Sequence, residues 1–188
     1  MRRYYEIYSD TFYHIYNKGF DSQTVFHGPK DYERFINTII RYQNEFNEII
    51  LYSYCLMPNH FHLLIKENSI EGPTKIPDFM RKIQNSYAKY FNLKYNKKGP
   101  VFIGRYNAKP VNNDNYLQMA IVYINFNPIK HKFVDNITDW QYTSYNYLTG
   151  IKSNNLTPVL NSTDNLQYSF KEIYNRYILE DLTPVLLD

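Results

Sequence analysis

The chain has 188 residues and a single cysteine, so it can form no internal disulfide bond, and its length suits one domain with at most a small appendage. No apolar run approaches the roughly 18 residues of a membrane span, and the first residues lack the apolar stretch of a signal peptide, so we expect a cytoplasmic protein with no membrane partner. The formal net charge of +3 allows a nucleic-acid partner without requiring one.

Aromatic residues are unusually frequent, with 21 Tyr and 12 Phe in the chain. Aromatic rings can stack on unpaired bases, each stacked base contributing roughly 1–3 kcal/mol, which suits a protein that binds single strands. Tyrosine can equally fill amphipathic surface, and composition does not separate the two uses. With 21 tyrosines, any one of them has a chance of only about one in twenty of being a nucleophile.

The first half of the chain predicts a strand, a helix and a hairpin. Residues 11–17 have the composition of a strand and end at a turn signal. From residue 31 to about residue 47 the apolar residues recur at helical spacing. Residues 49–56 and 60–66 form two further predicted strands, which Pro58 and Asn59 separate.

The second half adds a helix, a strand and a helix. The apolar spacing predicts a helix over about 76–95, a strand over 101–111 and a helix over about 114–127 that ends before Pro128. The order strand-helix-strand-strand-helix-strand is that of a split βαβ unit. We therefore expect an α+β fold of the ferredoxin-like kind, with an antiparallel sheet, helices on one face and a C-terminal extension.

Two histidines stand out on the predicted strand 60–66. His60 and His62 are separated by one apolar residue, so on a strand they point to the same face while Phe61 packs behind them. Such a pair can hold a divalent metal ion, although a metal site usually needs a third ligand. Two unrelated imidazoles on a solvated strand face are the alternative, and the spacing alone does not decide.

The last predicted helix carries a second polar pair. Tyr123 and Asn127 are four residues apart and therefore lie on one face, about 40° apart around the axis. They border an apolar stripe, so we expect them to look across at a sheet surface, where a cleft would form. The alternatives are an aromatic residue at the edge of the core and a polar residue at a helix end. The stripe consists of Leu117, Ala120, Ile121 and Ile124.

The run Met-Pro-Asn-His-Phe-His-Leu-Leu at residues 57–64 resembles the histidine-hydrophobic-histidine motif of the single-tyrosine HUH transposases. The likeness is greatest to the REP-associated tyrosine transposases and their insertion-sequence relatives, and it runs from about residue 11 to residue 148. It assigns residues 1–148 to a catalytic domain of this type and 149–188 to a C-terminal extension. Further segments match the family in order: 13–19 its first strand, 31–35 its first helix, 99–106 its last core strand, 123–128 its catalytic helix and 139–145 its tryptophan-serine element.

The resemblance implies a site and a chemistry. Tyr123 would be the nucleophile, while His60, His62 and Asn127 would hold a divalent ion, Mg or Mn, of which manganese tolerates histidine better. Attack would leave a 5′-phosphotyrosine and a free 3′-hydroxyl, as in a metal-dependent endonuclease and strand transferase for single-stranded DNA. The partner would be single-stranded or hairpin DNA, and both a monomer and a homodimer are open.

Two other classes of function stay open alongside this one. A domesticated DNA-binding protein could keep the fold and hairpin recognition without cutting, and a metal-binding structural or interaction protein would have no affinity for DNA. Among the remaining histidines, His14 is expected to be a packed residue or one that lies behind the site's ligands, and His27 and His131 are expected in loops. Cys55 is expected as a small buried apolar residue.

Six basic residues are expected to contact DNA. Arg105 and Lys109 fall on one face of the predicted strand 101–111, and Lys82 begins a run that resembles the family's second helix. A solvated helix face is the alternative for each lysine. The set is Lys18, Arg81, Lys82, Lys89, Arg105 and Lys109.

Overall fold

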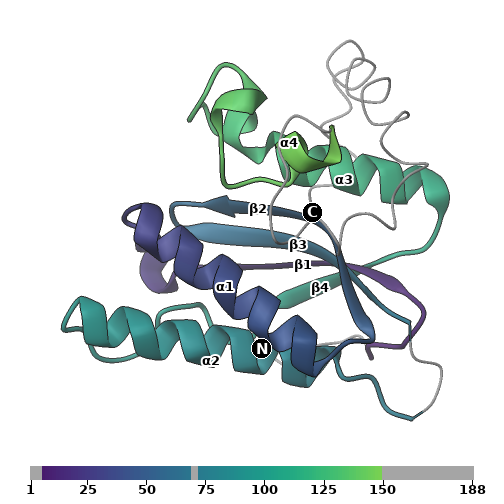
Figure 1. Cartoon of the computed structure of the whole chain (residues 1–188), viewed down its shortest axis with the longest axis horizontal. Coiled ribbons are helices and arrows are strands. Elements are labelled where there is room, and N and C mark those ends of the chain that lie inside the picture. The colour runs from purple at the N-terminus through teal and green to yellow at the C-terminus, as the bar shows by residue number, and fades with distance from the viewer. Residues whose placement is uncertain (1–5, 69–71, 150–188) are drawn as a thin grey trace.

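The computed structural model of the chain describes residues 6–68 and 72–149 (Figure 1). All of the predicted extension 149–188 except its first residue lies outside the described residues, and so does the segment 168–187, for which the sequence predicts a short helix and an extended end. The boundary between 148 and 149 therefore stays a prediction. No helix in the part of the chain that the structure describes is long and apolar enough to cross a membrane.

Four strands form one sheet in the order β2-β3-β1-β4, and each neighbouring pair is antiparallel. This is the α+β, ferredoxin-like arrangement that the order of predicted elements indicated. A connection of two residues, Pro58 and Asn59, joins β2 to β3. The strands are β1 (Phe12–Lys18), β2 (Ile49–Met57), β3 (His60–Glu67) and β4 (Asn107–Val111).

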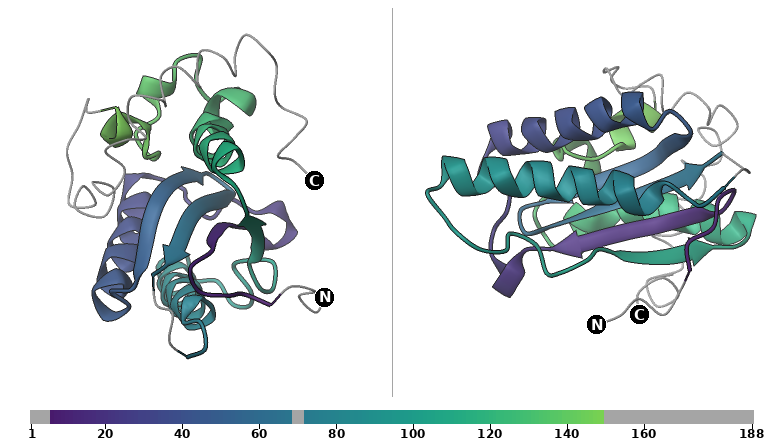
Figure 2. Two further views of the ribbon diagram at one scale, coloured as in Figure 1. Left: turned by 90° about the vertical axis from the view of Figure 1, so that its right-hand side faces the viewer. Right: turned by 90° about the horizontal axis from the view of Figure 1, so that it is seen from below.

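Helices cover both faces of the sheet: the two helices of the ferredoxin-like unit share one face, as expected, and the helix that follows the last strand covers the other. The helices α1 (Pro29–Glu45) and α2 (Ile76–Lys94) lie side by side on one face, whereas α3 (Asp114–Lys130) lies on the other (Figures 1 and 2). Short elements complete the fold: η1 (Phe20–Ser22), η2 (Ile137–Asp139) and α4 (Tyr145–Leu148).

The alternation of β3 explains the two layers. Phe61 and Leu63 belong to the core beneath α1 and α2, while Leu64 belongs to a second core together with Cys55 of β2 and the apolar face of α3. All of these side chains are fully buried. A sheet that is covered on both faces needs nearly continuous apolar strands, and β2 and β3 have them.

The predicted last strand is wrong over its first half. Within residues 101–106 only Phe102 pairs with a strand end, through an isolated bridge to Gly19, and regular pairing begins at Asn107. Gly104 has φ of +48°, a left-handed conformation that interrupts an extended run. Arg105 therefore precedes β4 and does not share a strand face with Lys109.

The helix α3 does not stop at Pro128 but continues to Lys130. A proline inside a helix removes one backbone hydrogen bond, here the one that the carbonyl of Ile124 would accept. The side chain of Asn127 supplies other donors, because its Nδ2 lies 2.8 Å from the Tyr123 carbonyl oxygen and 3.4 Å from that of Ile124. The amide thus compensates in part for the missing N–H group.

A buried polar network attaches α3 to β2. The fully buried Asn125 donates through Nδ2 to Ser53 Oγ at 2.9 Å, and its Oδ1 accepts from Ser144 Oγ at 2.9 Å and from Thr143. Ser144 Oγ also lies 2.9 Å from Ser53 Oγ. The segment after α3, which carries the predicted tryptophan-serine element, is therefore hydrogen-bonded to both the helix and the sheet.

The carboxylate of Asp31 links α1 to α2. It is fully buried and accepts hydrogen bonds from the backbone of His27 (2.8 Å), Tyr90 Oη (2.9 Å), Lys94 Nζ (2.6 Å) and Tyr95 Oη (2.6 Å). Burial alone would raise the pKa of this carboxyl group, but the hydrogen bonds outweigh burial and hold the pKa below its ordinary value. The charged form is therefore the one that stabilises the fold.

We predict that Asp31→Asn lowers the free energy of unfolding at neutral pH by about 1–3 kcal/mol, because buried donors lose a charged acceptor. The folded pKa lies below the unfolded value of about 3.9, so the carboxylate's contribution is present above that pH and is lost as the pH falls through the folded pKa. Urea unfolding of both proteins at several pH values measures the difference, which should shrink in acid.

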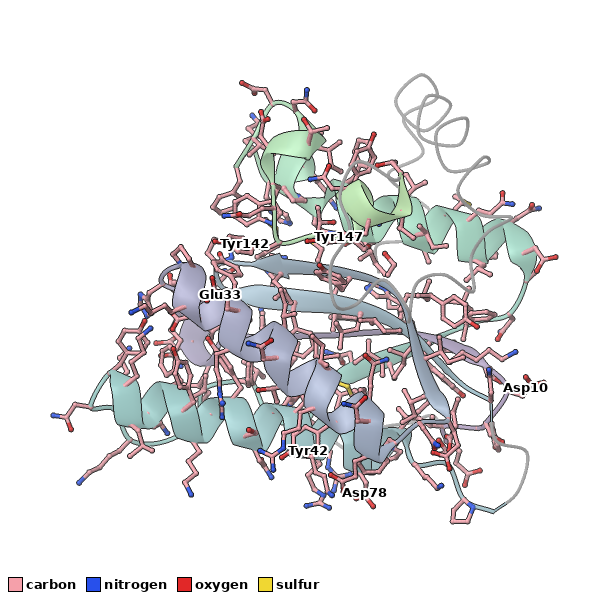
Figure 3. The ribbon with its side chains drawn as sticks, in the orientation of Figure 1. Asp10, Glu33, Tyr42, Asp78, Tyr142 and Tyr147 are labelled. Carbon is pink, nitrogen blue, oxygen red and sulfur yellow. The ribbon has the colours of Figure 1, made fainter. Side chains whose placement is uncertain are left out.

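The matched control is Asp78→Asn on the outer side of α2, where Asp78 pairs with Arg81 and both side chains are well exposed (Figure 3). Exposed pairs contribute little, so this variant should unfold close to wild type at every pH. Equal losses in the two variants would show that Asp31 has no special role.

Candidate functional site

A cavity of about 340 Å³ lies between the sheet and α3. The strand β3 contributes His60 and His62 to its lining, and α3 contributes Tyr123 and Asn127. Lys18, at the end of β1, also borders it. The structure therefore brings together all four residues of the predicted metal and nucleophile site, from segments that are about sixty residues apart in sequence.

The register of β3 aims the two histidines at this cavity. In the ladder with β1, His62 pairs with Tyr16 and His60 pairs with Lys18. The ring centroids of the two histidines are 5.0 Å apart, whereas Phe61 between them is buried in the opposite core. The expectation that both imidazoles share one face of a strand is confirmed.

Each imidazole uses its Nδ1 atom within the protein. Nδ1 of His60 lies 2.7 Å from Asn59 Oδ1, and Nδ1 of His62 lies 2.8 Å from Nε2 of His14. Hydrogen bonds of this kind orient a ring and determine which nitrogen faces a ligand. Nε2 of each ring is left as the nitrogen for a ligand in the cavity.

The histidines around the cavity are neutral near pH 7. Burial, followed by the nearby His131, lowers the pKa of His60 to about 4. Burial and then His14 hold the pKa of His62 well below its ordinary value, and burial and Lys109 lower the pKa of His14 to about 3. Metal ligation requires the neutral imidazole, so these shifts favour a ligand role.

Asn127 presents an oxygen to the same cavity. The residue is 1% exposed, its Nδ2 is directed at the helix carbonyls, and its Oδ1 accepts no hydrogen bond among the described residues. The side chain is near enough to His60 to act on the pKa of that ring, in the direction that opposes burial. A buried acceptor without a partner costs about 1–3 kcal/mol, so this oxygen is suited to a ligand.

Two imidazole nitrogens and one amide oxygen fit a divalent cation of intermediate softness. No group of three or more His, Cys, Asp or Glu side chains in the described ranges could hold a metal ion. A metal ion held by His60 and His62 would therefore need the amide of Asn127 as its third donor, as the resemblance implied.

The ring of Tyr123 lies against the histidines. Its centroid is 5.8 Å from those of both His14 and His62, and Lys130 Nζ is 5.3 Å from it. Tyr123 is only 7% exposed. Tyr116, two turns earlier on α3, is 42% exposed and does not line this cavity.

Sequence reasoning placed His131 in a loop and gave it no role. It directly follows α3, lines the cavity, and its ring centroid is 5.3 Å from that of His60. The available signal was its spacing, since Tyr123, Asn127 and His131 are each four residues apart. The expected helix end at Pro128 concealed it.

The predicted DNA contacts divide between the two sides of the sheet. Lys18 borders the cavity, and Lys109 pairs with His14 in the ladder between β4 and β1, on the side that faces α3. Arg105, outside β4, lines a different hollow together with Glu6. Of the six predicted contacts, the strand register therefore places Lys18 and Lys109 on the face of the sheet that carries His60 and His62.

The other three predicted contacts lie on α2, across the sheet from the cavity. Arg81 pairs with Asp78 at 3.0 Å, and Lys82 pairs with Glu45 of α1. Lys89 is exposed. Their role as DNA contacts stays a prediction.

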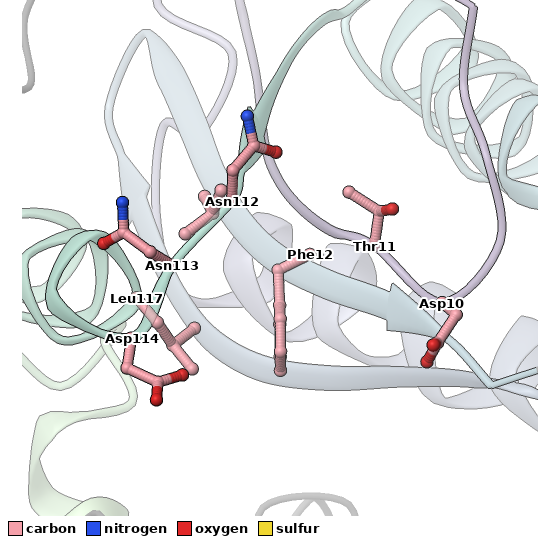
Figure 4. Close-up of a pocket in the computed structure, with 8 residues that line it drawn as sticks. Asp10, Thr11, Phe12, Asn112, Asn113, Asp114 and Leu117 are labelled. Carbon is pink, nitrogen blue, oxygen red and sulfur yellow. The ribbon is translucent and has the colours of Figure 1, made fainter.

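A second hollow, of about 260 Å³, opens where β4 leads into α3 (Figure 4). Its polar lining includes Asp10, Asn112, Asn113 and Asp114. It adjoins Phe12 at the start of β1, whereas His60 and His62 of β3 lie beside the other end of β1. The two sites are therefore separate, and this one contains no imidazole.

Comparison with known proteins assigns the family. A family model described as "Transposase IS200 like" matches residues 7–127, which is well over half of the chain and includes His60, His62, Tyr123 and Asn127. The chain belongs to this family. We therefore treat it below as an IS200-like transposase.

Two relatives of this IS200-like transposase extend the comparison. A curated protein of Haemophilus influenzae, named as a REP-associated tyrosine transposase, is 30% identical over 100 residues, which are 48% of this chain and 56% of that protein. The match thus spans little more than half the length of the relative. A solved REP-associated tyrosine transposase bound to a REP hairpin has a TM-score of 0.62 and 19% identity, covering 77% of this chain and 82% of that one. This second likeness shows the fold.

We predict that the imidazole of His60 in metal-free protein stays neutral at pH 6 and becomes protonated near pH 4. Because this folded pKa lies below the unfolded value of about 6.5, the unfolded chain takes up protons first, and stability is lost as the pH falls from about 6.5 towards 4. Histidine NMR resonances followed during a pH titration, with His60→Gln to assign the signal, measure the pKa. A midpoint near 6.5 would contradict the buried environment.

Proposed function

We propose that this transposase is a metal-dependent endonuclease and strand transferase for single-stranded DNA, with Tyr123 as its nucleophile. The observation that carries the proposal is the convergence of Tyr123, His60, His62 and Asn127 on one cavity. Membership in the IS200-like family supports transposition chemistry in general.

The proposed reaction is a transfer of the phosphate from DNA to tyrosine. Tyr123 Oη forms a bond to phosphorus, and the bond from phosphorus to the 3′ oxygen breaks. The phenol releases its proton to solvent, and the 3′ oxygen takes up a proton from solvent. The products are a 5′-phosphotyrosine and a free 3′-hydroxyl, and the reverse attack rejoins the strand. One phosphate ester bond to DNA is exchanged for one to tyrosine, and no atom changes its oxidation state. The reaction therefore needs neither an oxidant nor ATP.

The phenol needs activation, since its unperturbed pKa is near 10. A divalent ion held by His60, His62 and Asn127 would neutralise the scissile phosphate and favour the phenolate. The chain adds a positive charge of its own, because the ammonium group of Lys130 lies close to the Tyr123 ring. Of the two candidate ions, manganese accepts imidazole ligands more readily than magnesium does.

The proposed substrate is single-stranded DNA or a DNA hairpin. A solved structure of similar fold is bound to a REP hairpin, which supports this class of partner. We propose that Lys18 and Lys109 bind phosphates near the cleavage point, and their position on the cavity side of the sheet supports this role. The aromatic side chains at the cavity, such as Tyr16, suit unpaired bases.

We predict that Tyr123→Phe abolishes both cleavage and the covalent DNA adduct while the protein stays folded. The ring keeps its apolar area, so the free energy of unfolding should change by no more than about one hydrogen bond, roughly 0.5–1.5 kcal/mol. Incubation with labelled single strands and manganese, followed by denaturing electrophoresis, measures the adduct.

The matched control is Tyr116→Phe on the same helix, which should still form the adduct because Tyr116 does not line the cavity. The reverse pattern would move the active site. If wild type binds hairpins tightly but forms no adduct, the chain is a DNA-binding protein that does not cut.

We further predict that the protein prefers hairpins or single strands to a perfect duplex and that binding weakens with salt. Each neutralised phosphate adds roughly 0.7 to the slope of log affinity against log salt for single strands. Lys109→Gln should therefore lower the slope by about that amount. Fluorescence anisotropy with a hairpin and a duplex of equal length measures both effects, and equal affinity for the two DNAs would count against the proposed substrate.

A further inference from the structure

We propose that His14 is a positioning residue that selects the metal-binding tautomer of His62. The inference rests on the proposed function, because it assumes that His62 is a ligand. His14, a residue of β1, is not itself a proposed ligand, and the inference assigns the single proton that its ring shares with the ring of His62.

The two imidazoles are locked together by geometry. Nε2 of His14 lies 2.8 Å from Nδ1 of His62, and the rings stack with centroids 5.1 Å apart and an angle of 25° between their planes. His14 is 7% exposed and His62 is 6% exposed, so water does not compete for this contact. The strand register fixes the pair, because His62 lies opposite Tyr16, the next residue on the same face of β1 after His14.

Two nitrogens at this distance need one proton between them, and there are two ways to supply it. If His14 Nε2–H donates, His62 accepts at Nδ1, and the neutral His62 ring carries its own proton on Nε2, where it blocks a metal. If His62 Nδ1–H donates, the lone pair of Nε2 is available to a ligand. The position of one proton therefore decides whether His62 can act as a ligand.

The neighbouring histidine provides the pattern from which we infer the arrangement in His62. Nδ1 of His60 lies 2.7 Å from Asn59 Oδ1, and an amide oxygen can only accept, so the proton of His60 is on Nδ1. If His62 also carries its proton on Nδ1, then both proposed ligands, His60 and His62, have an unprotonated Nε2. His14 then accepts at Nε2 and carries its own proton on Nδ1.

His14 also touches the proposed nucleophile. Its ring meets that of Tyr123 edge to face, with centroids 5.8 Å apart. One buried side chain thus contacts both a proposed ligand and the tyrosine that would attack. A role in core packing alone would depend on the size of this ring, whereas the proposed role depends on its acceptor nitrogen.

Two substitutions separate these roles. His14→Phe keeps a ring of similar size but has no acceptor, and His14→Gln carries an amide oxygen close to the place of Nε2. We expect His14→Phe to weaken the binding of Mn²⁺ alone by about 10–100-fold, the usual effect of losing such a hydrogen bond, and His14→Gln to recover most of it. Titration of the full chain with Mn²⁺, with free ion followed by electron paramagnetic resonance and no DNA present, measures the affinity.

A second measurement does not depend on a variant. Long-range ¹H–¹⁵N NMR spectra of metal-free wild type show which ring nitrogen of His62 carries the proton, and we expect Nδ1. A proton on Nε2 would overturn the proposal, as would unchanged Mn²⁺ affinity in a folded His14→Phe. If that variant does not fold, the wild-type spectrum still decides.

Controls distinguish failure of this inference from failure of the proposed function. His27→Phe makes the same exchange away from the cavity and should leave Mn²⁺ affinity unchanged. His60→Ala removes a proposed ligand and should abolish tight binding. Normal binding in His60→Ala would refute the metal site itself, whereas loss there with no effect of His14→Phe would refute the role of His14 alone.

Discussion

The two-residue connection between β2 and β3 sets the register on which both cores and the histidine pair depend. The carbonyl groups of Pro58 and Asn59 accept three backbone hydrogen bonds from the segment that follows β1, so the connection is held from outside as well as by its own strands. A slip of one residue would exchange the faces of the strand, placing Phe61 in the cavity and the imidazoles of His60 and His62 in the apolar core. The packing of Phe61 on one face of the sheet therefore holds His60 and His62 in position on the other face.

Much of the fold could be predicted from local sequence patterns, because periodicity reports directly on strands and amphipathic helices. The strand that contains His60 and His62 is an example. The side of the sheet on which α3 lies could not, since it follows from tertiary packing of residues such as Leu64 and Cys55 rather than from the helix itself. The apolar run of β2 was the available sign of two covered faces.

The site was predictable where roles follow from spacing and resemblance, and less so where they follow from contacts. Tyr123 and Asn127 share a helix face because they are four residues apart, and both line one cavity with His60 and His62. The hydrogen bond between His14 and His62 joins residues 48 positions apart, and nothing in a single sequence encodes it. His131 was missed because a proline usually ends a helix, and here a neighbouring amide lets the helix continue.

The amide of Asn127 also keeps this part of the cavity wall uncharged. Asn127 meets two carbonyl oxygens of its own helix, and a side chain that carries a hydrogen-bond donor can face them without repulsion. Aspartate, its closest relative in shape, would place a negative charge against those oxygens. Pro128, by leaving the Ile124 carbonyl without its usual backbone donor, thus favours an uncharged residue at the position before it. Replacing Pro128 would return a backbone donor to the Ile124 carbonyl, but the Tyr123 carbonyl would still disfavour a carboxylate at position 127.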